Sequence, residues 1–139
     1  MLVGSPTRHI YIYNTEVPDG FERVQFAVLK SEMGEPDFPT QDAIALNGKK
    51  VFLKGYIHPT SISSISSKTF VLVPDWGTCC FGTQPPLTHM IQVRLVNEAY
   101  AYKSVRQHSI AGTFEVHPYL KPVEGLEGVF YEFEAEHFQ

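Results

Sequence analysis

The strongest constraint on the fold is a regular alternation of side chains over residues 129–136. The positions expected to face inward are Val129, Tyr131, Phe133 and Ala135, and the intervening ones are Phe130, Glu132, Glu134 and Glu136. Because successive side chains of a β-strand point to opposite faces of a sheet, this run predicts a strand with one buried face. We expect the glutamate row to be a solvated face that also discourages edge-to-edge pairing.

Four other runs predict strands earlier in the chain, at residues 51–58, 70–74, 89–96 and 109–117. The dipeptide Asn47-Gly48 is a turn signal ahead of the first run, and Gly55 within that run predicts a bulge or a sharp bend. Residues 97–104 are the one segment that suits a helical link, between the third and fourth strands. We therefore expect an all-β or mostly β fold: a small five-stranded, OB-like Greek-key barrel with at most one or two short helices. A β-sandwich fragment is the alternative.

The first 47 residues have a less regular pattern. Residues 21–30 fit both strand alternation and helical spacing, residues 32–42 are a polar, proline-rich loop, and residues 10–14 suit an edge strand or an arm that pairs with another chain. We expect residues 1–43 to form an N-terminal arm or loop that packs partly on a barrel domain of residues 44–139.

Charge and hydropathy narrow the classes of function. The net charge is −4 with neutral histidines, and no cluster of Lys or Arg is present. Because proteins that bind nucleic acid need a basic face, an OB-type nucleic-acid module is disfavoured, although Phe52, Tyr56, Trp76 and Tyr119 suit a stacking platform. No run approaches the about 18 apolar residues of a membrane-spanning helix. The start of the sequence lacks the pattern of a signal peptide, so the protein is expected in the cytoplasm unless a leader has been removed.

The loop of residues 74–89 holds the candidate site, because it contains the only two cysteines of the sequence side by side. The candidate metal ligands are Cys79, Cys80, His89, His58 and Asp75. These residue types bind zinc or copper, but adjacent cysteines do not form the CxxC pair of a strong zinc or redox signature. In an extended backbone the two thiols point apart, so only one of them could share a site with His89.

Two other interpretations of this loop remain open. A rigid loop shaped by proline and glycine, with the cysteines as small buried hydrophobic residues, is the simplest. A thiol-dependent enzyme using Cys79 or Cys80 with His89 is the other, although no motif marks a catalytic residue or a cofactor-binding loop and a non-enzymatic role is favoured.

The segments KKVFLKGYIHP, FVLVPDWGTCCFGTQPP and QVRL resemble a family of small bacterial proteins of unknown function. That family carries a V-x-x-x-G-Y-x-x-P strand, then LVP-aromatic-G-x-C, then a proline-rich stretch. The matching positions are Gly55, Tyr56, Pro59, Leu72, Val73, Pro74, Trp76, Gly77, Cys79, Pro85 and Pro86. The family commonly has a histidine two residues after its cysteine, where this chain has Phe81. Cys80 and His89 would then have to supply the additional metal donors.

This resemblance covers about residues 44–136 and implies an OB-like barrel exported to the bacterial envelope. It also implies an association with transporter components of a metal-related kind, and no enzyme activity is established for the family. We therefore expect an uncharacterised binding or accessory module of the envelope, periplasmic if a leader has been removed. Its expected cofactor is zinc or copper, and its expected partner is an envelope protein or a transporter component.

Overall fold

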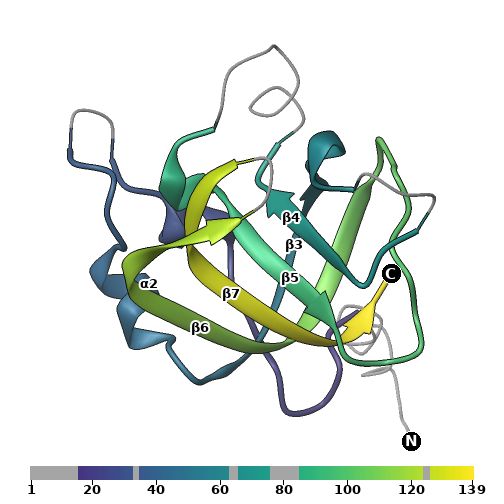
Figure 1. The fold of residues 1–139 in the computed structure, drawn as a ribbon. Coiled ribbons are helices and arrows are strands. Elements are labelled where there is room, and N and C mark those ends of the chain that lie inside the picture. Colours follow the sequence, from purple (N-terminus) through teal and green to yellow (C-terminus); the bar gives the residue numbers. More distant parts are fainter. Residues whose placement is uncertain (1–15, 33–34, 63–65, 76–84, 124–125) are drawn as a thin grey trace, which may run out of the picture.

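The computed structural model describes residues 16–139 except 33–34, 63–65, 76–84 and 124–125 (Figure 1). The strands are β2 (Glu22–Arg23), β3 (Lys50–Ile57), β4 (Thr69–Val73), β5 (Ile91–Leu95), β6 (Gln107–Val123) and β7 (Leu126–Phe138). The short helices are the 3-10 turns η1 (Phe26–Leu29), η2 (Pro59–Ser61) and η3 (Leu87–His89), and the α-helix α2 (Gln41–Ala45). The prediction of a mostly β fold with short helices is confirmed.

The six described strands form one mixed sheet in the order β2-β3-β4-β5-β7-β6. An additional antiparallel pairing joins β3 to β6, so that β3, β4, β5, β7 and β6 close a barrel-like ring (Figure 1). The β5–β7 pair is parallel, as is the β2–β3 pair at the margin of the sheet. The five strands of the ring lie at the five runs that the alternation predicts.

The buried faces of these strands supply the hydrophobic core, which explains why the alternation predicts them well. Tyr131, Phe133 and Ala135 of β7 are buried, and the ring of Phe114 on β6 lies 5.3 Å from that of Tyr131. Val51 and Leu53 of β3 are buried on the same side of the strand. The apolar residues thus meet inside the ring.

Two glycines allow strands to approach closely. The register of β3 on β6 continues without interruption through Gly55, so the predicted bulge is not there. A Cβ atom at Gly55 would lie 2.7 Å from the carbonyl oxygen of Val73, which is the reason for glycine at this position. Register shifts lie instead in the pairing of β6 with β7, and the first is between Ala111 and Gly112, where a Cβ on Gly112 would clash with the Glu134 carbonyl oxygen.

Residues 97–104 do not form the predicted helix. The Asn97 side chain accepts a hydrogen bond from the Ala99 backbone N–H at 2.9 Å and donates one to the Glu136 carbonyl at 3.0 Å. Lys68 Nζ donates to the Ala99 carbonyl at 2.9 Å, and Ala101 forms an antiparallel bridge with Ser67. These tertiary partners satisfy the backbone groups that a helix would have paired internally.

The segment before the ring contains parts of both structures that its sequence suggests. Glu22–Arg23 pairs with β3, and Phe26–Leu29 turns into a 3-10 helix. The side chain of Thr40 caps α2 by accepting a hydrogen bond from the Ala43 N–H at 3.1 Å. Residues 10–14 lie outside the described residues, and the division at residue 43 stays a prediction.

Candidate functional site

The predicted metal loop leaves the sheet at the end of β4 and returns at η3, beside β5. Cys79 and Cys80 lie outside the described residues. Of the other candidates, Asp75 is exposed, His89 is partly exposed and His58 is buried. The structure therefore describes the two ends of the loop and not its thiols.

His89 has the chemistry of an available ligand. Its Nδ1 atom is buried and has no hydrogen-bond partner among the described residues. Burial lowers the pKa of His89, and the charge of Lys30 lowers it further, while Asp37 and Asp75 act in the opposite direction. The imidazole is consequently neutral near pH 7, which is the form that binds a metal ion.

Asp37 fixes the position of η3, which carries His89. Its carboxylate accepts hydrogen bonds from the backbone N–H groups of Leu87 and of Thr88, the latter at 2.9 Å. Ser31 donates to the same carboxylate at 3.3 Å, and the Ser31 N–H donates to Thr88 Oγ1 at 3.0 Å. The polar, proline-rich loop of residues 32–42, through Asp37, thus orients one end of the candidate site.

His58 has a structural role at the end of β3. Its Nδ1 accepts a hydrogen bond from the Thr60 N–H at 3.3 Å and so caps η2. Burial lowers the pKa of this imidazole. Among the described residues, neither His58 nor His89 belongs to a group of three metal-binding side chains. Only Nε2 of His58 is left for a ligand.

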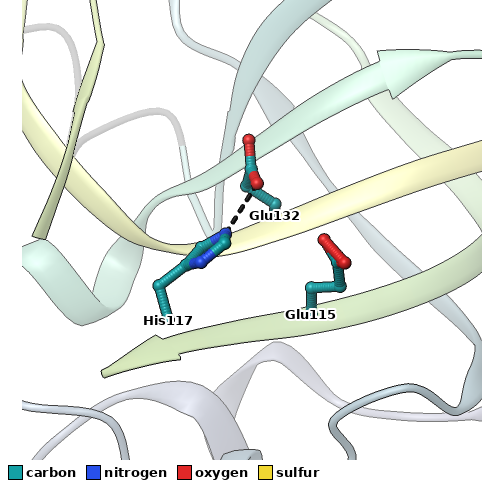
Figure 2. A group of neighbouring side chains, drawn as sticks. All are labelled: Glu115, His117 and Glu132. Atoms are coloured by element: carbon teal, nitrogen blue, oxygen red, sulfur yellow. Dashed lines mark hydrogen bonds and ion pairs between the residues drawn. The ribbon is translucent and has the colours of Figure 1, made fainter. Parts of the chain in front are cut away.

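A different cluster does bring three such side chains together: Glu115 and His117 of β6 and Glu132 of β7. Their ligand atoms all lie within 4.8 Å of one another. His117 Nε2 donates a hydrogen bond to Glu132 Oε1 at 2.6 Å, and Lys121 Nζ lies 2.7 Å from Glu132 Oε2. Figure 2 shows Glu115 and His117 on β6 beside Glu132 on β7, with a dashed line for the hydrogen bond between His117 and Glu132.

The strand register produces this cluster. Glu115 lies directly opposite Glu132, and the register shifts between Val116 and Lys121. Two carboxylates opposite each other repel, so the neighbouring ammonium group of Lys121 stabilises the pair. Burial alone would raise the pKa of Glu132, but the hydrogen bonds from Lys121 and His117 outweigh it, and the pKa lies below its usual value.

The glutamate row faces outward as predicted, but its second expected role is wrong. Strand β7 lies between β5 and β6, so the row protects no sheet edge. Each glutamate instead meets a cation. Glu134 pairs with Arg94, and Glu136 lies 2.6 Å from Lys50 Nζ. The row is therefore a set of cross-strand ion pairs.

One of the four aromatic residues that suit a stacking platform for nucleic acid is not available to a base. Phe52 is only 2% exposed, and the Arg23 guanidinium covers its ring at 5.1 Å. Tyr119 is 82% exposed, Tyr56 is partly buried, and Trp76 lies outside the described residues. A base cannot stack on a ring that is already covered.

Comparison with protein families gives one match, to a protein family of unknown function (DUF3299), over residues 26–139. The chain belongs to the DUF3299 family. The crystal structure of a DUF3299 family protein from Pseudomonas aeruginosa PAO1 is similar, with a TM-score of 0.61 and 22% sequence identity. The similarity covers 86% of this chain and 95% of that one. At this identity the likeness establishes a shared fold.

A comparison of this DUF3299 chain with curated proteins found no match. Within the described residues, no helix is long and apolar enough to cross a membrane. The match to DUF3299 confirms the expectation that the chain belongs to a family of unknown function.

Proposed function

We propose that this DUF3299 protein is a binding or accessory module of the bacterial envelope that binds zinc or copper at the loop of residues 74–89. The proposed ligands are His89 and one of the two thiols, Cys79 or Cys80, and Asp75 and His58 are the remaining candidates. Thiolate and imidazole are the donors that both metals prefer.

The observation that carries this proposal is the unpartnered Nδ1 of His89. Leaving a buried polar atom without a partner costs free energy, so a native structure normally supplies one. A metal ion held by a thiolate of the same loop would supply it. The Asp75 carboxylate acts electrostatically on this imidazole and would add negative charge near a bound cation.

The cellular setting follows from the sequence resemblance. A leader removed during export would place the protein in the periplasm, where its proposed partner is an envelope protein or a transporter component. Without a leader, the same module would act in the cytoplasm. The net charge of −4 favours a protein partner over nucleic acid.

The test is a titration of the reduced protein with Zn²⁺ and with Cu⁺, followed by native mass spectrometry. We expect the wild type to hold one ion at the loop that the Cys79→Ser/Cys80→Ser variant loses, so that the variant binds one ion fewer than the wild type. His89→Gln should lower the affinity for this ion by about tenfold or more, since it removes one ligand. His137→Gln, at an exposed histidine, is the matched control and should bind as the wild type does.

Equal metal uptake by the wild type and the double cysteine variant would contradict the proposal. In that case, rapid alkylation of one cysteine at neutral pH would favour thiol chemistry instead. Slow labelling of both cysteines would leave the structural interpretation of the loop.

A further inference from the structure

We propose that Glu115, His117 and Glu132 form a second divalent-metal site, on the outer face of the β6–β7 hairpin. This site is independent of the loop site and contains no thiol. Its donor set, one imidazole and two carboxylates, suits Zn²⁺ and related divalent ions better than Cu⁺.

The geometry needs only small side-chain movements to bind an ion. Two ligands about 2.1 Å from a tetrahedrally bound zinc ion lie about 3.4 Å apart. The present ligand atoms lie within 4.8 Å of one another, and His117 Nε2 and Glu132 Oε1 are 2.6 Å apart. The longer separations between ligand atoms must therefore shorten, and the distance between His117 Nε2 and Glu132 Oε1 must lengthen. Rotation of the glutamate side chains achieves both changes.

The backbone that carries the ligands is held by strand pairing. Glu115 pairs with Glu132, and Val116 pairs with Tyr131, which is fully buried. Glu115 and His117 are two residues apart and share a strand face, so both can reach an ion bound above Glu132. Three protein ligands would leave a fourth position for water or for a partner's side chain.

The charges favour a cation at this place. Glu115 and Glu132 are like charges directly opposite each other, and a divalent ion would bind both. Lys121 now neutralises one oxygen of Glu132, so it competes with the metal for that carboxylate. His117 must also give up its hydrogen bond to Glu132 when Nε2 binds the ion.

The experiment uses the full chain with the substitutions Cys79→Ser and Cys80→Ser, so that the loop thiols cannot contribute. Zn²⁺ binding is measured by isothermal titration calorimetry, and the ¹⁵N resonances of the His117 imidazole are followed by NMR. We expect binding of one ion and a large shift of the Nε2 resonance. Glu115→Gln and His117→Gln should each weaken binding about tenfold or more.

Two further variants make the test specific. Glu134 lies on the same strand face but pairs with Arg94, outside the cluster. The zinc affinity of Glu134→Gln should therefore stay within about twofold of that of the cysteine-free protein. Lys121→Gln removes the competing cation and should tighten binding about two- to tenfold. All four substituted residues are exposed or partly exposed, and an unchanged melting temperature confirms that each variant is folded.

Absence of zinc binding in the cysteine-free background would overturn this proposal without affecting the loop site. A loss of zinc affinity in Glu134→Gln as large as that in Glu115→Gln would also overturn it. So would weaker zinc binding in Lys121→Gln. Conversely, zinc binding that persists in the cysteine-free protein supports the hairpin site even if the loop thiols bind nothing.

Discussion

The hydroxyl group of Tyr131 is one link between the barrel-like ring of strands and the segment that precedes it. Tyr131 Oη donates a hydrogen bond to the Leu29 carbonyl at 2.8 Å and accepts one from the Thr40 N–H at 3.3 Å. The side chain is fully buried, and burial raises the pKa of its phenol to about 12. The hydroxyl therefore stays protonated and can donate at any physiological pH.

Tyr131→Phe should lower the free energy of unfolding by about 1–3 kcal/mol, because it leaves the Leu29 carbonyl without its donor in a buried place. Urea denaturation measures the change. Tyr119→Phe is the matched control, since Tyr119 is 82% exposed and its hydroxyl has water available. A loss of similar size in both variants would show that the buried hydrogen bonds contribute little.

At this scale the sequence predicts core residues better than site residues. Tyr131 and Phe133 follow from alternation alone, because burial repeats along the strand. Glu115 and Glu132 are 17 positions apart, and only the register of β6 on β7 makes them neighbours. The sequence does show a glutamate two residues before a histidine on one strand face, at Glu115 and His117. The residue opposite them on β7 could not be predicted, because the register of the two strands shifts along their length.

Among the elements, η3 depends on a residue far away in the sequence. Asp37 accepts hydrogen bonds from the backbone of Leu87 and Thr88, 50 and 51 residues later. Charge-assisted bonds of this kind are about twice as strong as neutral ones. The position of His89 at the end of this turn therefore rests on Asp37.

Asp37→Ala should destabilise the protein by about 1.5–3 kcal/mol, because the two backbone donors lose a charged acceptor. Hydrogen exchange should show the largest loss of protection at the amides of Leu87 and Thr88. Asp19→Ala, on the exposed turn before β2, is the control and should leave these amides unchanged. Unchanged exchange in Asp37→Ala would contradict the proposed role.

The predicted and observed elements differ where contacts with distant parts of the chain determine the local backbone structure. The five strands of the ring could be predicted because each has its own alternating pattern. The helix expected at residues 97–104 is absent, since Lys68 and Ser67 bind its backbone from outside the segment. Helix α2 was missed because five residues are too few for a helical period, and its signal is the cap at Thr40.

For the whole molecule, three histidines link stability to pH. Burial lowers the pKa of His58, His89 and His108 below the ordinary value of 6.5. The unfolded chain then takes up protons at pH values where the folded protein does not, so protonation favours unfolding. Their contribution is complete above pH 6.5 and decreases as the pH falls toward the folded pKa values.

The melting temperature should consequently fall as the pH is lowered from about 6.5 to 5 when the ionic strength is held constant. The decrease should steepen below about pH 4.5, because the pKa of Glu132 is also lowered in the folded protein. His108→Gln should reduce the slope above pH 5, because it removes one of the three histidines whose pKa is lowered by burial. A melting temperature that stays level or rises on acidification would contradict this linkage.

The order of strands in the ring has a consequence for synthesis of the chain. Strand β7 lies between β5 and β6, and it follows both of them in the sequence. A nascent chain that has released residues only as far as β6 can pair β3, β4 and β5 and add β6 to β3, but the edges of β5 and β6 remain open. Open edges are the usual starting points of aggregation. The ribosome-bound chain is thus most in need of a chaperone in the interval between the emergence of β6 and that of β7.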